Sequence, residues 1–264
     1  MASDPNLLIF LLIGQSNMEG APPPDLQDQV TDDRVKVLAY DNTGGRLYNE
    51  WYAACPPLHS TGLGPGDYFA KLLAARLPAQ YRIGLVPCAI NGVDIDFFGK
   101  GVISARRAEF PIPPDNLRSG AYDWVVERAR LAQRDGVVRG ILFHQGESDC
   151  GQSVWVVKVA DIVEQLRADL ELGSDVPFVA GELLRDGRCA AHNALVNQLP
   201  HWIPNCHIVS SARLTGMDLF HFDLASQREL GKRYAEAMLE SLQLEFANRA
   251  STPVLGPAVC GTEL

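Results

Sequence analysis

The fold is decided by one stretch near the start of the chain, Leu7-Leu-Ile-Phe-Leu-Leu-Ile13, which runs directly into Gly14-Gln15-Ser16-Asn17. This apolar run is far shorter than the roughly 20 residues that a membrane-spanning helix needs. An apolar run of this length without polar alternation is typical of a parallel strand covered on both faces. The stretch therefore predicts a central strand that ends at a polar turn carrying a serine.

Further apolar runs of strand length follow along the chain, and stretches of helical periodicity separate them. The strand candidates are residues 83–88, 138–143, 176–180 and 207–210, with a weaker one at 35–40. The helical stretches are residues 67–77, 121–134, 154–172, 190–199 and 224–244. This alternation predicts an α/β fold, a three-layer α/β/α sandwich around a central parallel sheet. No repeat or break in composition divides the chain, so we expect residues 1–264 to form a single domain.

Two segments rich in proline and glycine, residues 21–66 and 97–119, interrupt the alternation. Long loops inside a compact domain tend to line binding sites, so we expect both segments to lie near the functional site. The last residues, 251–264, are expected to wrap the surface.

Charge and composition exclude several classes of partner. The formal net charge is −9, and no run of Lys or Arg exceeds two residues, so we expect no nucleic-acid partner. We expect no membrane association. No Lys or Arg precedes the first strand, so we expect no signal peptide within this sequence, and a cytoplasmic protein and a secreted one without its leader would look alike.

The cysteines and the known cofactor motifs point away from a metal or a nucleotide. The spacing of the six cysteines includes no zinc pattern, and no dinucleotide fingerprint, phosphate-binding loop or HExxH motif occurs, so we expect no cofactor and no metal. Buried free thiols are the simpler expectation in a chain of this size, although one or two disulfides remain open. The cysteines are Cys55, Cys88, Cys150, Cys189, Cys206 and Cys260.

Polar motifs directly follow three of the predicted strands. Because parallel strands end at a common edge of the sheet, these motifs are expected to lie together. With one further motif before the last helical stretch, they supply a hydroxyl, an imidazole with a carboxylate, and amide donors, which is the inventory of acyl transfer through a serine. The motifs are Gly14-Gln15-Ser16-Asn17, Ile90-Asn91-Gly92, His144-Gln145-Gly146-Glu147-Ser148-Asp149 and Asp218-Leu219-Phe220-His221.

The candidate nucleophile and base each have a structural alternative. Ser16 follows a buried strand through a glycine, so its hydroxyl is presented at a sharp turn and its N–H can bind an oxyanion, although it could simply cap the next helix. Asp218 stands three residues before His221, where its carboxylate can fix the imidazole tautomer, although the two could form a structural pair. Asp223 and His207 are expected to support the site or to lie on the surface.

Several residues are candidates to donate an N–H group to an oxyanion. Gln145 is a neutral donor directly after a strand, and we expect Glu147 beside it to be a positioning residue rather than the base. Asn91 and Gly92 offer a backbone N–H on a tight turn, or only an ordinary turn. Gly64-Pro65-Gly66 before a predicted helix could bind an anion or merely end a loop.

In this order and spacing, the motifs resemble the SGNH hydrolase superfamily, and within it the carbohydrate esterases of the sialate O-acetylesterase and acetylxylan esterase group, which is similar to carbohydrate esterase family six. The resemblance spans nearly the whole chain, and the blocks that carry it are Gly14-Gln15-Ser16-Asn17-Met18, Gly64-Pro65-Gly66, Val86-Pro87-Cys88-Ala89-Ile90-Asn91-Gly92, His144-Gln145-Gly146-Glu147 and Asp218-Leu219-Phe220-His221. It implies a flavodoxin-like α/β/α fold and the removal of acetyl groups from sugars without a metal. An acetylated carbohydrate is thus the expected substrate.

The resemblance also implies roles for particular residues. It implies a Ser16-His221-Asp218 triad and an oxyanion hole from the N–H of Ser16, a backbone N–H at Asn91 or Gly92, and the side chain of Gln145. Gln15, Asn17, His144 and Glu147 are expected to support the site. Relatives commonly have Gly-Gly followed by Thr or Ser where this chain has Asn91-Gly92-Val93, and a tryptophan where it has Phe97-Phe98. We therefore expect a reshaped acyl or sugar pocket.

Two other functions fit the same scaffold. A lipid or thioester hydrolase of the same superfamily would prefer longer acyl chains than acetyl. A non-catalytic sugar-binding protein would need none of the Ser, His and Asp side chains that this chain retains.

Overall fold

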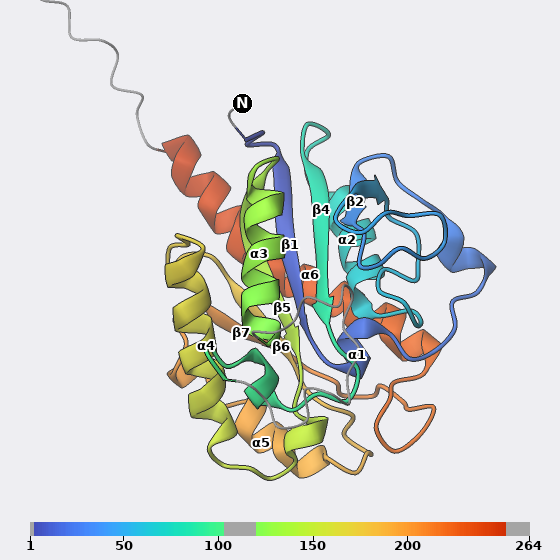
Figure 1. Cartoon of the computed structure of the whole chain (residues 1–264), viewed down its shortest axis with the longest axis vertical. Coiled ribbons are helices and arrows are strands. Elements are labelled where there is room, and N and C mark those ends of the chain that lie inside the picture. Colours follow the sequence, from blue (N-terminus) through green and yellow to red (C-terminus); the bar gives the residue numbers. More distant parts are fainter. Residues whose placement is uncertain (1–2, 103–119, 252–264) are drawn as a thin grey trace, which may run out of the picture.

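The computed structural model, which describes residues 3–102 and 120–251, is built on one seven-stranded sheet (Figure 1). The sheet has the order β3-β2-β4-β1-β5-β6-β7, and every pair is parallel except β2 with β3. The strands are β1 (Leu7–Gly14), β2 (Val35–Leu38), β3 (Trp51–Ala53), β4 (Arg82–Ala89), β5 (Val137–His144), β6 (Phe178–Gly181) and β7 (Cys206–Val209). The expected α/β fold around a central parallel sheet is confirmed, except that the edge strand β3 runs antiparallel to β2.

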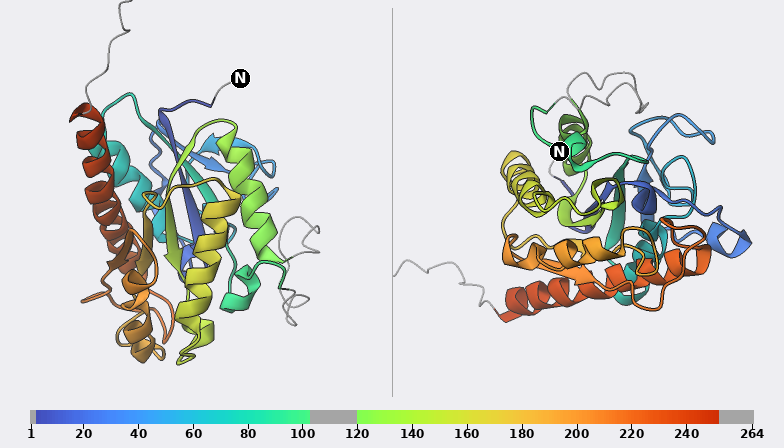
Figure 2. Two further views of the ribbon diagram at one scale, coloured as in Figure 1. Left: turned by 90° about the vertical axis from the view of Figure 1, so that its left-hand side faces the viewer. Right: turned by 90° about the horizontal axis from the view of Figure 1, so that it is seen from below.

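Helices cover both faces of this sheet (Figure 2). The α-helices are α1 (Ser16–Glu19), α2 (Pro65–Arg76), α3 (Ala121–Gln133), α4 (Trp155–Asp169), α5 (Asn193–Val196) and α6 (Leu224–Ser251). On β1, Ile9 and Leu11 pack in one cluster with α3 and α4, whereas Leu8 and Phe10 pack in another with α2 and α6. Because alternate residues of β1 enter different cores, a fully apolar strand is what this position requires.

Short 3₁₀ turns fill several connections, and they account for most departures from the sequence predictions. They are η1 (Leu26–Gln29), η2 (Ile95–Phe98), η4 (Glu147–Asp149), η5 (Ala190–His192) and η6 (Leu199–His201). The single helix expected at 190–199 is wrong, because η5 and the one-turn helix α5 replace it. The edge strand β3 was not predicted, since its side chains are only partly buried. Residues 103–119 and 252–264, which include parts of two predicted segments, lie outside the described residues. Within the described part of the chain, no helix is both long and apolar enough to cross a membrane.

The strand ends bring the polar motifs together, as expected. Gly14, the last residue of β1, pairs with Ala89 of β4 and with His144 of β5. A Cβ atom on Gly14 would lie 2.0 Å from the carbonyl oxygen of His144, and its φ is 149°. Only glycine fits this position, and the close approach sets the serine turn directly against the end of β5.

The crossing of α2 and α6 gives a test of the fold. A Cβ atom on Gly231 of α6 would lie 2.4 Å from the backbone oxygen of Pro65, and 3.1 Å from the backbone nitrogen of Phe69. We expect Gly231→Ala to lower the free energy of unfolding by about 1–3 kcal/mol, because two helix backbones must separate. Urea denaturation measures the change, and an unchanged midpoint and slope would contradict the crossing.

Candidate active site

Three side chains from two distant parts of the chain form a hydrogen-bonded series at the C-terminal edge of the sheet. Ser16 opens α1 one residue after the end of β1, and its Oγ lies 2.9 Å from Nε2 of His221. Nδ1 of His221 lies 2.8 Å from Oδ2 of Asp218 on the loop before α6. The structure thus brings together the three residues that the sequence analysis assigned to acyl transfer.

Asp218 is organised by its own loop. Its Oδ1 accepts the backbone N–H groups of Phe220 and His221, each at 2.7 Å. Partial burial acts to raise the pKa of Asp218, but the hydrogen bonds from His221 and these backbone groups outweigh it and hold that pKa below its usual value. A charged Asp218 favours the His221 tautomer with the proton on Nδ1, which leaves the Nε2 lone pair free to accept the Ser16 hydroxyl proton.

Asn17 fixes the position of His221 relative to Ser16. Its fully buried amide donates from Nδ2 to the carbonyl oxygen of Phe220 at 2.9 Å, and its Oδ1 accepts the backbone N–H of Phe222 at 3.1 Å. These two backbone groups flank His221. One side chain next to the candidate nucleophile therefore clamps the loop that carries the candidate base.

Glu147 and His144 lie behind this clamp, in the supporting positions expected for them. Asn17 Nδ2 also donates to Oε1 of Glu147 at 2.6 Å. Burial raises the pKa of Glu147 to about 7 and lowers the pKa of His144 to about 3. His144 is therefore neutral, with its Nδ1 3.1 Å from the hydroxyl of Tyr234, which itself donates to the carbonyl oxygen of Phe143.

Two backbone N–H groups are available for an oxyanion. Among the residues that the structure describes, no acceptor is hydrogen-bonded to the N–H of Ser16 or of Gly92. Ser16 is the first residue of α1, where N–H groups have no partner inside the helix. Gly92 has a φ of 73°, which glycine adopts readily in a tight turn after β4.

Gln145 does not fit the oxyanion role that the sequence analysis gave it. Its Nε2 donates to the carbonyl oxygen of Val93 and to Oδ2 of Asp149, so both amide hydrogens are in use. Its Oε1 accepts the indole N–H of Trp155 at 2.6 Å. The side chain is therefore held in the core. Asn91, by contrast, has an exposed side chain at the site edge.

The segment before α2 packs beneath the serine turn, and this explains Gly64-Pro65-Gly66. A Cβ atom on Gly64 would lie 2.4 Å from the carbonyl oxygen of Met18, so this glycine permits close packing on α1. His59, which the sequence analysis missed, accepts the backbone N–H of Ala89 at 3.2 Å. Burial lowers the pKa of His59 to about 3, so it is a neutral acceptor. Part of the loop 21–66 thus packs against α1 and the end of β4 and supports the candidate site.

Asp223 and His207, which we expect to support the site or to lie on the surface, form their hydrogen bonds with residues outside the triad. Asp223 accepts the backbone N–H of Ser226 near the start of α6. His207 bonds to Asn205 and Ser241.

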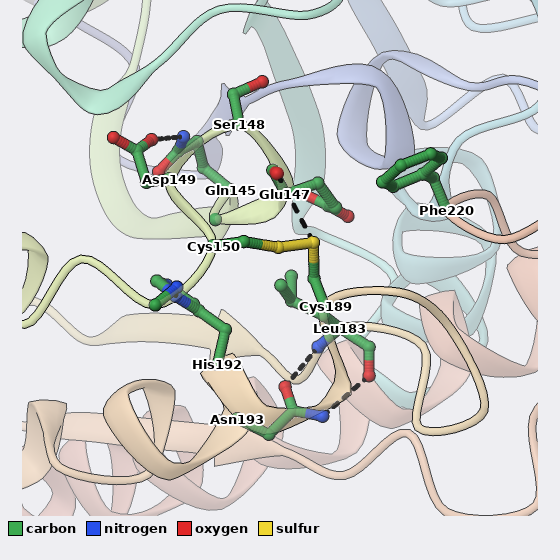
Figure 3. Close-up of a disulfide and its surroundings, with 12 residues drawn as sticks. Gln145, Glu147, Ser148, Asp149, Cys150, Leu183, Cys189, His192, Asn193 and Phe220 are labelled. Atoms are coloured by element: carbon green, nitrogen blue, oxygen red, sulfur yellow. Dashed lines mark hydrogen bonds between the residues drawn. A yellow bond between two sulfur atoms is a disulfide. The ribbon is translucent and has the colours of Figure 1, made fainter.

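One disulfide lies beside the site (Figure 3). It joins Cys150 to Cys189, with Cα atoms 5.5 Å apart, so the simpler expectation of free thiols is wrong for this pair. Cys55, Cys88 and Cys206 are free, and Cys260 lies outside the described residues. In the described part of the chain, no group of three or more His, Cys, Asp and Glu side chains is placed to hold a metal ion.

Comparisons with known proteins identify related chains. Residues 6–240 match the model of a family described as carbohydrate esterase, sialic acid-specific acetylesterase. A solved protein from Arabidopsis thaliana is 25% identical, with a TM-score of 0.72 over 90% of this chain and 99% of that chain. NanS is 21% identical, with a TM-score of 0.69 over 92% and 100% of the two chains. A carbohydrate acetylesterase from Xanthomonas citri is 20% identical, with a TM-score of 0.65 over 87% and 55%. NanS and the Xanthomonas citri protein share the fold of this chain.

The contacts of Gln145 predict an effect on stability more than on turnover. Gln145→Ala removes the partners of Trp155, Val93 and Asp149 in the core, so we expect the free energy of unfolding to fall by about 2–4 kcal/mol. Urea denaturation and steady-state kinetics on the same preparation measure both effects. A stable variant whose kcat alone falls by about 10² would return Gln145 to the oxyanion hole.

The raised pKa of Glu147 predicts how stability depends on pH. The folded protein keeps this proton up to about pH 7, whereas the unfolded chain releases it near the ordinary value of 4.5. Between these values the unfolded state binds fewer protons, so stability falls as the pH rises. We expect Glu147→Gln, which can still accept from Asn17, to avoid a loss of up to about 3 kcal/mol between pH 4.5 and 8. If the free energy of unfolding changes with pH in the same way in both proteins, Glu147 keeps an ordinary pKa and the prediction is wrong.

Proposed function

The chain belongs to the carbohydrate esterase family of sialic acid-specific acetylesterases, and from this membership and its site geometry we propose that it removes O-acetyl groups from sugars through an acetyl-enzyme on Ser16. The family makes it a carboxylic ester hydrolase. The observation that carries the proposed mechanism is the hydrogen-bonded series Ser16-His221-Asp218, at 2.9 and 2.8 Å.

The first half-reaction transfers the acetyl group to the enzyme. The Ser16 oxygen attacks the acetyl carbonyl carbon while Nε2 of His221 takes the hydroxyl proton. The tetrahedral intermediate then expels the sugar oxygen, and His221 returns the proton to it. Asp218 stabilises the imidazolium that exists between these two proton transfers.

The second half-reaction releases acetate. Water takes the place of the sugar, His221 removes a proton from it, and the water oxygen attacks the acetyl carbon of the acetyl-enzyme. The tetrahedral intermediate then expels the Ser16 oxygen, which takes the proton back from His221, and acetate leaves. In both halves, the backbone N–H groups of Ser16 and Gly92 are the donors that would face the developing oxyanion. Asn91, with its exposed side chain after β4, is the remaining candidate for a side-chain donor.

An acetylated carbohydrate is the proposed substrate. The family description and the carbohydrate acetylesterase from Xanthomonas citri support this class. Acetylated xylo-oligosaccharides and O-acetylated sialic acid are the two substrates to compare. Rates on p-nitrophenyl esters from acetate to octanoate separate an acetylesterase from a lipid or thioester hydrolase, because only the acetylesterase prefers the shortest chain.

The nucleophile is tested by Ser16→Ala. We expect kcat on p-nitrophenyl acetate to fall by roughly 10³ to 10⁶ with the fold intact, because the acetyl-enzyme cannot form. Ser174→Ala is the matched control, since Ser174 is exposed between α4 and β6, at the opposite edge of the sheet. Undiminished turnover in folded Ser16→Ala protein, or a fluorophosphonate adduct on another residue, would remove Ser16 from this role.

A further inference from the structure

Ser148, in the turn η4 after β5, joins three segments of the candidate site. Its Oγ donates to the carbonyl oxygen of Gly92 at 3.0 Å, and its backbone N–H donates to Oε1 of Gln15 at 3.3 Å. The same Oε1 accepts the backbone N–H of Gly146, and Nε2 of Gln15 lies 3.5 Å from Ser148 Oγ. Ser148 thus ties the turn after β4 to the turn after β5 and to the residue before Ser16.

The turn that carries Ser148 is itself tethered. Cys150 directly follows η4, and its disulfide partner Cys189 has its Sγ 3.4 Å from the carbonyl oxygen of Glu147 (Figure 3). In this view Ser148 points away from the disulfide. The neighbouring Arg188 donates its backbone N–H to the carbonyl oxygen of Leu219, within the loop of the candidate base. The disulfide therefore anchors η4 to a segment that already contacts this loop.

We propose that Ser148 positions the Gly92 turn for oxyanion binding and that the Cys150–Cys189 disulfide keeps Ser148 in place, so that reducing the disulfide slows turnover. This inference rests on the proposed function. Oxyanion donors act only at about 2.7–3.1 Å from the developing charge, so a small shift of the Gly92 turn weakens them. Such a loss affects kcat more than KM, because the bond strengthens only in the transition state.

The redox step is an ordinary exchange with a dithiol. Cys150 is exposed and Cys189 is buried, so a thiolate of the reductant attacks the sulfur of Cys150 and releases the thiolate of Cys189, which takes a proton. In the mixed disulfide, the second thiolate of the reductant attacks the reductant sulfur that is bonded to Cys150. Cys150 leaves as a thiol, and the reductant becomes a cyclic disulfide. An oxidised dithiol reverses both steps.

The first arm of the test changes Ser148 in the oxidised protein. We expect Ser148→Ala to lower kcat on p-nitrophenyl acetate by about tenfold with little change in KM, in line with the loss of one neutral hydrogen bond. Ser148→Thr keeps the hydroxyl and should recover most of the rate. Equal kcat in the parent and the Ala variant, or an equal loss in both variants, would overturn the role of Ser148.

The second arm changes the disulfide and needs no folded Ser148 variant. Treating the parent with dithiothreitol should lower kcat by about three- to tenfold, and reoxidation should restore it. The matched control is the double variant Cys150→Ser with Cys189→Ser, which should be slow from the start and unaffected by dithiothreitol. Thiol counting before and after treatment shows whether the disulfide is present, and free thiols at both positions in the untreated protein would overturn the proposal.

The two arms are joined by a double-mutant cycle. If the disulfide acts through Ser148, dithiothreitol should slow Ser148→Ala by less than twofold, because the contact that it protects is already gone. Full additivity of the two effects would overturn the proposal. Labelling of Ser16 by a fluorophosphonate is followed in every variant. Labelling elsewhere would sink the proposed function, whereas intact Ser16 labelling with no redox effect would sink this inference alone.

Discussion

The candidate site depends on the side-chain amide of Asn17. It follows Ser16 in the sequence and bonds to the backbone groups on both sides of His221, while Glu147 accepts a second hydrogen from it. A nucleophile and a base that come from opposite ends of the chain are thus set by one rigid, fully buried group. Gly14 provides the other half of this constraint, because its contact with the carbonyl oxygen of His144 fixes where the serine turn begins.

The titratable groups in and around the candidate site favour different protonation states. Asp218 is held charged by hydrogen bonds, whereas burial favours the neutral forms of Glu147, His144 and His59. Neutral buried groups hold their neighbours by hydrogen bonds and avoid most of the desolvation penalty of a charge. In the proposed reaction, new charge therefore develops on the imidazole of His221 and on the oxyanion beside Ser16.

The sheet and the approach of Ser16, Asp218 and His221 to one another could be predicted from the sequence because both leave local signals: continuous apolar runs, a serine just after a strand, and a carboxylate three residues before a histidine. The side-chain direction of Gln145 left no such signal. A motif places a residue at the end of a strand, but the partners Trp155 and Asp149 decide where its amide points. The pairing of Cys150 with Cys189 depends on how the turns after β5 and β6 meet, which spacing alone does not reveal. Ser148 belongs to the polar motif after β5, but its hydrogen bond to Gly92 depends on how the turns after β4 and β5 fold together.

The most direct test of the account is to locate the acetyl group during turnover. Mixing the protein with excess p-nitrophenyl acetate, quenching with acid within milliseconds and mapping the peptides by mass spectrometry shows which side chain is acetylated. An acetyl-enzyme mechanism on Ser16 predicts an acetyl group on this side chain that forms as fast as p-nitrophenol is released and that is absent in Ser16→Ala. A stable acetyl group on another residue that forms as fast as product, with Ser16 unmodified, would contradict it.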